Sequence, residues 1–231
     1  MKQTRIAVLG VYRSGSTAVA GALHHLGVDM GPPFFKGFYE SAWLSKQLRR
    51  WWDEPHLREK ASQATRVRVL AQWIQEREQG GAKWVGMKHP LLSLCGEDLV
   101  QAWGPDTRFI RCCRPLEDSI DSLKRLGRKV NGEFLQGRLM AALDCFFAGR
   151  EHLAVEFADL MSNPRCEVER LREYVQIAAD RERIDRAVHF IEPGRKSKVE
   201  TENGEKLGTE KASGLGAVWG ALRKAVTGQG K

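Results

Sequence analysis

The residues best suited to chemistry lie near the amino end, in the segment 10–17 with the sequence GVYRSGST. The apolar run 6–9 precedes this segment, and apolar residues at helical spacing follow it over 18–26. A strand, a glycine-rich turn and a helix present backbone N–H groups and a positive helix end to an anion. The segment therefore predicts a site for a phosphate-like group.

The spacing of Gly10 and Gly15 matches that of a Walker-type phosphate loop, and Thr17 holds its hydroxyl position. Ser16 replaces the lysine of that motif, and the cation stands at Arg13 inside the loop. In that motif the lysine and a bound Mg²⁺ contact the β- and γ-phosphates of a nucleoside triphosphate. Loss of the lysine therefore disfavours hydrolysis of nucleoside triphosphates. The alternative interpretation is an ordinary tight turn whose glycines supply unusual backbone angles.

A second candidate anion site follows the predicted strand 107–113. Arg114 stands at the carboxyl end of that strand, where open α/β sheets bind ligands, and Ser122 follows two helical turns later. The alternative is a surface salt bridge from Arg114 to Glu117 or Asp118, which would contribute little. We expect the pair Arg114 and Ser122 to bind an anion.

Composition limits the class of protein. The chain has 231 residues and a net charge of +8, a globular balance of charged and hydrophobic residues that favours an anionic ligand. Its longest apolar runs are too short to span a membrane and no secretory signal is visible, so we expect a cytoplasmic enzyme. The basic residues are scattered without a nucleic-acid-binding motif, so no specific nucleic acid is predicted. The five cysteines show no metal-like spacing and are predicted to be reduced and mostly buried.

Strands and helices alternate along the chain. This order predicts a three-layer α/β/α fold with a central parallel sheet, like that of the P-loop NTPases. The predicted strands are 6–9, 84–87, 107–113 and 152–157. The predicted helices are 18–26, one from Glu40 onward, one from Pro55 to the glycines at 80–81, 94–103, 115–126, 134–148, 164–175 and 183–191.

The composition changes at residue 193. We predict one domain over 1–193 and a flexible basic tail over 194–231. Apolar residues in the tail, between Leu215 and Val226, are spaced as on a short amphipathic helix. The alternatives for this segment are a helix that binds a partner or a membrane surface, ordinary fraying, and docking on the chain's own domain.

Several segments together resemble the sulfotransferases, particularly their bacterial and carbohydrate-type members. Residues 12–17 (YRSGST) resemble the 5′-phosphosulfate-binding loop of that family, and residues 109–122 resemble its 3′-phosphate-binding motif, an arginine followed by a serine eight residues later. Residues 37–40, 84–90 and 155–164 are similar to further segments, and the resemblance covers roughly 4–196.

The resemblance implies a donor, 3′-phosphoadenosine 5′-phosphosulfate (PAPS), and no metal. It implies transfer of a sulfuryl group to a hydroxyl of a small-molecule or carbohydrate acceptor. The implied cofactor-binding residues are Arg13, Ser14, Gly15, Ser16, Thr17, Arg114 and Ser122.

The implied catalytic residues are Glu40, Lys88 and His89. Glu40 is the expected general base. His89 is the alternative base, and it stands where the family often has aspartate. Lys88 would neutralise charge on the bridging oxygen of the leaving phosphate. Because Pro115 follows Arg114 directly, Ser119 competes with Ser122 for the 3′-phosphate.

Two other functions are compatible with the residues. A P-loop small-molecule kinase, or another nucleotide-dependent enzyme, is supported by Gly10, Gly15 and Thr17 and opposed by Ser16 in the lysine position. A non-catalytic anion or nucleic-acid binder is suggested by the charge of +8 and the basic tail. The residues leave the acceptor undetermined.

Overall fold

The chain is organised around a parallel sheet of four strands in the order β4-β1-β5-β6. These strands are β1 (Thr4–Leu9), β4 (Trp84–Lys88), β5 (Arg108–Cys113) and β6 (Leu153–Glu156). A computed structural model describes residues 3–35, 37–53, 56–126 and 132–191. The predicted tail, residues 194–231, lies outside the described residues.

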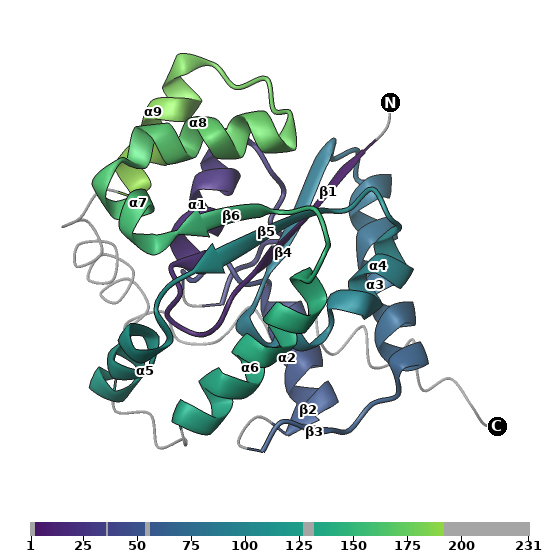
Figure 1. The fold of residues 1–231 in the computed structure, drawn as a ribbon. Helices are drawn as coiled ribbons and strands as arrows, with labels where there is room; N and C mark the ends of the chain where they lie inside the picture. Colours follow the sequence, from purple (N-terminus) through teal and green to yellow (C-terminus); the bar gives the residue numbers. More distant parts are fainter. Residues whose placement is uncertain (1–2, 36, 54–55, 127–131, 192–231) are drawn as a thin grey trace, which may run out of the picture. The chain divides into compact units, whose positions relative to one another are not determined.

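Helices cover both faces of the sheet (Figure 1). On one side lie α1 (Ser16–Leu26), α7 (Phe157–Ser162), α8 (Pro164–Val175) and α9 (Arg181–Ile191). On the other lie α2 (Ala42–Trp51), α3 (Gln63–Gln79), the 3-10 helix η1 (Pro90–Leu94), α4 (Gly96–Trp103) and α6 (Gly132–Phe147). Helix α5 (Leu116–Arg125) follows β5. The three-layer α/β/α prediction is therefore confirmed.

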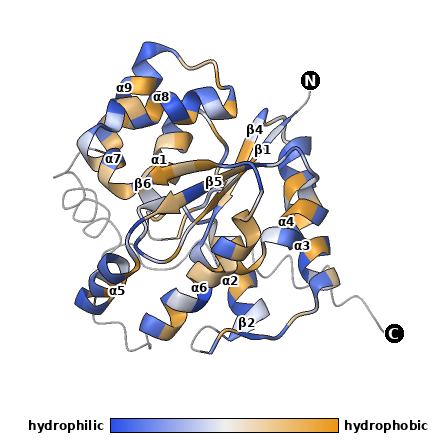
Figure 2. Ribbon diagram, viewed as in Figure 1, coloured by the Kyte–Doolittle hydropathy of each residue, from blue (hydrophilic) through white to orange (hydrophobic). Residues whose placement is uncertain are grey.

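Alternation along β1 explains the two cores. Ile6 and Val8 pack in the core beneath α1, whereas Ala7 and Leu9 pack in the core beneath α3, α4 and α6. All four side chains are fully buried, as expected for a central parallel strand covered on both faces. Figure 2 shows the resulting apolar colouring of the sheet strands between helices that are polar on their outer sides.

The register of the strands places the predicted site residues at one edge. Val8 pairs with Lys88, and Leu9 pairs with Arg111. Because parallel strands end at the same edge, the loop after Leu9, the end of β4 and the turn after β5 adjoin each other.

Two predicted helix starts are wrong. Helix α2 begins at Ala42, not Glu40, because the Phe35 N–H donates to the Glu40 carbonyl (2.8 Å) in a hairpin closed by the bridge between Phe34 and Ser41. Helix α3 begins at Gln63, not Pro55. Leu57 has a left-handed φ of 49°, which a helix does not accommodate, and the Ser62 hydroxyl caps the later start.

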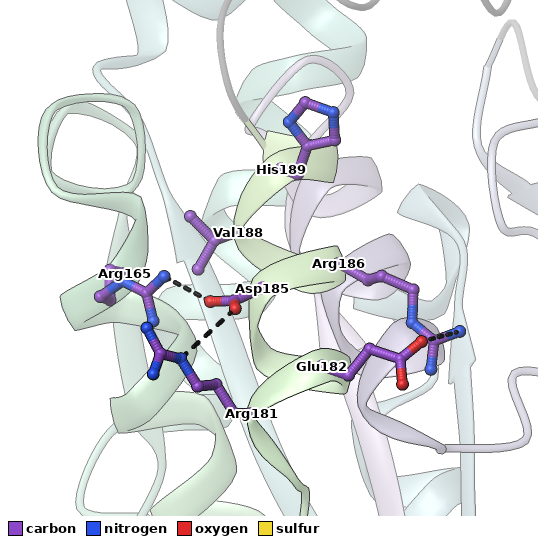
Figure 3. Close-up of a pocket in the computed structure, with 7 residues that line it drawn as sticks. All are labelled: Arg165, Arg181, Glu182, Asp185, Arg186, Val188 and His189. Carbon is purple, nitrogen blue, oxygen red and sulfur yellow. Dashed lines mark hydrogen bonds and ion pairs between the residues drawn. The ribbon is translucent and has the colours of Figure 1, made fainter.

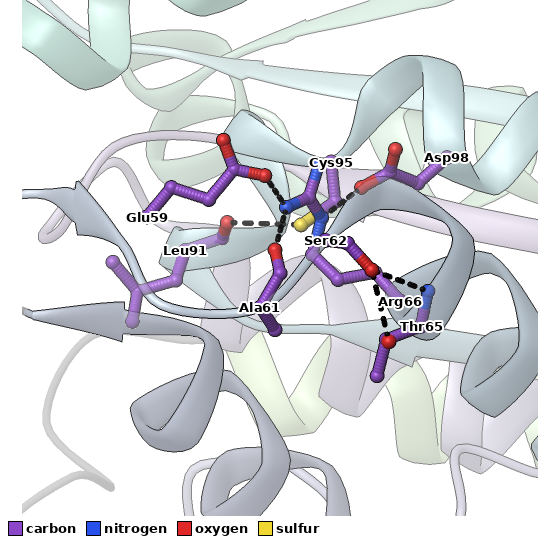
Figure 4. A network of polar contacts seen from close by, with 8 residues as sticks. All are labelled: Glu59, Ala61, Ser62, Thr65, Arg66, Leu91, Cys95 and Asp98. Atoms are coloured by element: carbon purple, nitrogen blue, oxygen red, sulfur yellow. Dashed lines mark hydrogen bonds and ion pairs between the residues drawn. The ribbon is translucent and has the colours of Figure 1, made fainter.

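A short antiparallel hairpin occupies part of the segment that was predicted as helix. It pairs β2 (Trp52–Asp53) with β3 (Arg58–Glu59). Buried Arg66 of α3 joins β3 to α4, because its guanidinium contacts Glu59, donates to the Ala61 carbonyl (2.6 Å) and pairs with buried Asp98 (2.6 Å) (Figure 4). A buried arginine with two carboxylates and a carbonyl is fully paired, so this network has a structural role.

Two further sequence expectations need correction. The prediction of mostly buried thiols holds for Cys95 and Cys112, but Cys145 and Cys166 are exposed on the outer sides of α6 and α8; all five cysteines are free. The predicted strand 152–157 ends at Glu156, and α7 begins at Phe157. Within the described residues, no helix combines the length and apolar character that a membrane crossing requires.

Candidate active site

The loop between β1 and α1 has the backbone geometry of an anion-binding turn. Arg13 has φ 65° and Gly15 has φ 90°, so two residues of this short turn adopt left-handed conformations. The Ser14 N–H donates to the Val11 carbonyl (3.3 Å), and turns with left-handed residues commonly form concavities whose remaining N–H groups bind anions. Helix α1 starts directly after Gly15 and directs its free N–H groups to the same place.

Both glycines of the loop are required by close contacts. A Cβ on Gly15 would lie 2.6 Å from the ring of Phe157, and a Cβ on Gly10 would lie 2.5 Å from the Ser14 hydroxyl oxygen. Ser14 is 1% exposed, and its Oγ has no hydrogen-bond partner among the described residues. A buried hydroxyl without a partner is costly, so an anionic oxygen bound in the loop would satisfy it.

The second predicted motif meets this loop directly. The Arg13 Nε donates to the Ser122 Oγ (3.0 Å), and the Arg114 Nη1 donates to the Arg13 carbonyl (3.1 Å). Arg13, Arg114 and Ser122 are therefore brought together, although 109 residues separate Arg13 from Ser122. Ser119 is oriented differently, because its hydroxyl is fully buried and donates to the Leu116 carbonyl of its own helix (2.7 Å).

The guanidinium of Arg114 packs against the aromatic ring of Phe157. Its guanidinium carbon lies 4.3 Å from the centroid of Phe157, a distance typical of cation–π contact. Its Nε is buried and has no hydrogen-bond partner in the described part of the chain. No ion pair with Glu117 or Asp118 forms there, so Arg114 keeps donor capacity for an anion. Phe157 thus contacts both Arg114 and Gly15 and joins the two predicted anion sites.

The predicted catalytic residues also meet. The Lys88 ammonium, 3% exposed, donates to Glu40 Oε1 (2.7 Å), to the Thr17 hydroxyl (3.0 Å) and to the Phe38 carbonyl (3.4 Å). Lys88 thereby connects the loop with the segment that carries Glu40. Although Glu40 is not in a helix as predicted, the Phe34–Ser41 hairpin brings its carboxylate to the sheet edge.

His89 lies on the other side of Glu40. Its Nε2 is 3.8 Å from Glu40 Oε2, and its Nδ1 accepts a hydrogen bond from the Leu91 N–H (3.1 Å). An accepting Nδ1 assigns the proton of the neutral ring to Nε2, which faces Glu40. In this tautomer the Nε2–H of His89 faces Glu40, although the 3.8 Å between Nε2 and Oε2 exceeds a hydrogen-bond distance.

Sequence reasoning missed two residues that contact the loop, Gln136 and Phe157. Gln136 of α6 is fully buried, and its amide bonds both the N–H and the carbonyl of Tyr12. Its only sequence signal is a polar residue beside the apolar stripe of α6. Phe157 carried a weak signal, since it follows directly after the last sheet strand.

A separate arginine-rich pocket lies on α8 and α9, and it contains none of the predicted site residues (Figure 3). Its charges are paired with each other: Asp185 with Arg165 (2.5 Å) and Arg181 (3.8 Å), and Glu182 with Arg186 (3.7 Å). Exposed ion pairs of this kind contribute little to stability. Because each arginine faces a carboxylate, little positive charge remains for an anionic ligand.

No family model matches the chain, and no curated protein matches it. Solved structures do share its fold. Sulfotransferase STF9 from Mycobacterium avium is 15% identical with a TM-score of 0.56, over 83% of this chain and 68% of that chain. The sulfotransferase domain from the curacin biosynthetic pathway is 16% identical with a TM-score of 0.55, over 79% and 77% of the two chains.

A sugar kinase from Janibacter sp. HTCC2649 is also similar, with 17% identity and a TM-score of 0.51 over 76% of this chain and 96% of that chain. Identities this low establish architecture without establishing activity. The chain has the α/β fold of the bacterial sulfotransferases. Its fold is also similar to that of the sugar kinase.

Proposed function

We propose that this chain is a PAPS-dependent sulfotransferase that transfers a sulfuryl group to a hydroxyl of a small-molecule or carbohydrate acceptor. The observation that carries the proposal is the junction of the two predicted anion sites, where Arg13 contacts Ser122 and Arg114 contacts the Arg13 carbonyl. A nucleotide with an anionic group at each end requires two such sites at one sheet edge. Two buried polar atoms that have no hydrogen-bond partner among the described residues, Ser14 Oγ and Arg114 Nε, could donate to oxygens of this ligand.

In the proposed site, the loop residues 13–17 bind the 5′-phosphosulfate, and Arg114 and Ser122 bind the 3′-phosphate. The N–H groups of the loop and the guanidinium of Arg13 stabilise charge that develops during transfer. Lys88 is proposed to donate to the bridging oxygen of the leaving phosphate, since its ammonium already contacts Thr17 at the start of α1. The protein's contribution is mainly orientation and charge stabilisation.

Glu40 is the proposed general base. Its carboxylate takes the proton of the acceptor hydroxyl as that oxygen attacks sulfur in line with the departing phosphate oxygen. The contacts of His89 favour this assignment over the rival one, because the Nδ1 of His89 is occupied by the Leu91 N–H and its Nε2 faces Glu40. His89 orients the base in this scheme.

A P-loop kinase is the second candidate, and the similarity to the sugar kinase favours it. Against it stand Ser16 in the lysine position and the binding of the Thr17 hydroxyl to Lys88, since Thr17 is the hydroxyl that would hold Mg²⁺. Within the described residues, no group of three or more His, Cys, Asp or Glu side chains is arranged to hold a metal ion.

Ligand-dependent stability separates these candidates. A ligand that binds the native state raises the melting temperature, so 3′-phosphoadenosine 5′-phosphate (PAP) should stabilise the chain more than ATP with Mg²⁺. Transfer of label from [³⁵S]PAPS to a panel of hydroxyl acceptors then tests the reaction and identifies the acceptor class. Stronger stabilisation by ATP with Mg²⁺, together with metal-dependent ATP consumption, would favour the kinase and overturn the proposal.

A further inference from the structure

Gln136 is a fully buried polar residue in the core-facing part of α6. Its helix neighbours Leu135, Leu139 and Leu143 pack in the core beneath the sheet, and no exposed surface remains on Gln136 itself. Burying a primary amide is unfavourable unless its donor and its acceptor are both paired. The partners of this amide therefore indicate why a polar residue occupies the position.

Both ends of the Gln136 amide bond the same residue of the anion loop. Its Nε2 donates to the Tyr12 carbonyl (2.6 Å), and its Oε1 accepts from the Tyr12 N–H (3.0 Å). These two hydrogen bonds engage the peptide planes on both sides of Tyr12. Because two planes are held by one rigid amide, rotation of either plane would break a buried hydrogen bond.

The second of these planes also contains the N–H of Arg13. In a trans peptide the N–H points opposite to the carbonyl of the same plane. When Gln136 binds the Tyr12 carbonyl, it directs the Arg13 N–H away from α6. Arg13 then adopts its left-handed φ of 65°, a conformation that is uncommon for residues other than glycine. The orientation of the Arg13 N–H thus depends on a side chain that lies 124 positions from Tyr12 in the sequence.

We infer that Gln136 is a positioning residue that fixes the anion loop of the proposed sulfotransferase site. The inference rests on the proposed function for its ligand, but the restraint on the loop is a property of the protein alone. Its side chain does not take part in the reaction. Together with the Arg13–Ser122 contact from α5, it holds the start of the loop from the α5–α6 side.

Gln136→Leu tests the inference, because leucine keeps the volume and removes both hydrogen bonds. We expect the dissociation constant of PAP and the KM for PAPS to rise about tenfold, while the KM for the acceptor stays unchanged. Leu143→Ala is the matched control: it weakens the same core two helical turns away and should lower stability without changing PAP affinity. Equal losses of PAP affinity in the two variants would overturn the inference.

A second readout needs no ligand. Amide hydrogen exchange in residues 13–17 should accelerate in Gln136→Leu more than in Leu143→Ala. Gln136→Met keeps the unbranched shape and volume of the side chain and also removes both hydrogen bonds, so it should likewise accelerate exchange if the leucine variant fails to fold. Unchanged loop exchange in a folded Gln136 variant overturns the inference. Failure of wild-type protein to bind PAP, with exchange accelerated in the variant, would instead refute the proposed donor.

Discussion

Two arginine-rich regions of the molecule differ in what their guanidinium groups contact. On α8 and α9, Arg165, Arg181 and Arg186 pair with Asp185 and Glu182. At the carboxyl edge of the sheet, Arg13 contacts a serine, and Arg114 contacts a carbonyl and an aromatic ring. Among the described residues Arg114 has no carboxylate partner, so its guanidinium charge remains available to an anionic ligand, whereas the guanidinium charges on α8 and α9 are largely neutralised by Asp185 and Glu182.

These two regions also illustrate that a pocket alone does not identify a ligand-binding site. The α8–α9 pocket is lined by side chains of two helices, and each of its three arginines pairs with Asp185 or Glu182. The sheet edge instead combines buried polar atoms that have no partner in the described part of the chain, left-handed backbone and a buried lysine. These features cost stability, and a bound ligand would offset them.

The largest effect is expected from Glu40→Gln. If Glu40 is the general base, turnover should fall by about 10²–10⁴-fold, because glutamine cannot take up the proton. PAP affinity should change little, since the amide oxygen still accepts from Lys88. Turnover numbers and PAP titrations measure the two quantities. A variant with full turnover would exclude Glu40 as the base, and parallel measurements on His89→Asn would then test the rival.

Arg114→Ala compared with Arg165→Ala tests the difference between the two regions most directly. Removing Arg114 should weaken PAP binding by roughly 1.5–3 kcal/mol, or about 10–150-fold, the range for charged hydrogen bonds. Arg165 pairs with Asp185 on α8–α9, so its removal should leave PAP affinity unchanged. Calorimetric titration gives both values. Equal losses in the two variants would indicate nonspecific attraction to a basic protein.

A smaller difference is expected between Ser122→Ala and Ser119→Ala. Ser122 contacts Arg13, and loss of its hydroxyl should weaken PAP binding by about 0.5–1.5 kcal/mol. Ser119 donates to its own helix, so its replacement should leave PAP affinity intact. If Ser119→Ala has the larger effect on the PAP dissociation constant, the 3′-phosphate assignment must move to Ser119.

The smallest effect concerns the cysteine thiols. Cys145 and Cys166 should react quickly with a thiol reagent in the native protein, whereas Cys95 and Cys112 should react only after unfolding.

Burial raises the pKa of Cys95 from its ordinary value of 9.0 to about 12. The unfolded thiol therefore ionises first, and the free energy of unfolding should fall as the pH rises above about 9. Reaction time courses and unfolding curves at several pH values measure these effects.

Local patterns were sufficient for the sheet and for most helices. Strands 6–9, 84–87 and 107–113, and the helix 164–175, agree with the observed elements because an apolar period of two or 3.6 is a local property. The predicted start of α2 is wrong because the Glu40 carbonyl accepts a hydrogen bond from the N–H of Phe35, a residue of the preceding hairpin. The β2–β3 hairpin was missed because Arg66 stabilises it from another element.

The sequence by itself determined the two candidate anion sites and the residues that stand in them, since glycine spacing and the position of a residue at a strand end are readable along the chain. Only the tertiary structure decided that Ser122 rather than Ser119 faces Arg13, that Lys88 joins Thr17 to Glu40, and that Gln136 and Phe157 support the loop. The physical reason is that these contacts join residues tens to more than a hundred positions apart. Helix rotation and packing set their geometry, and no local pattern records it.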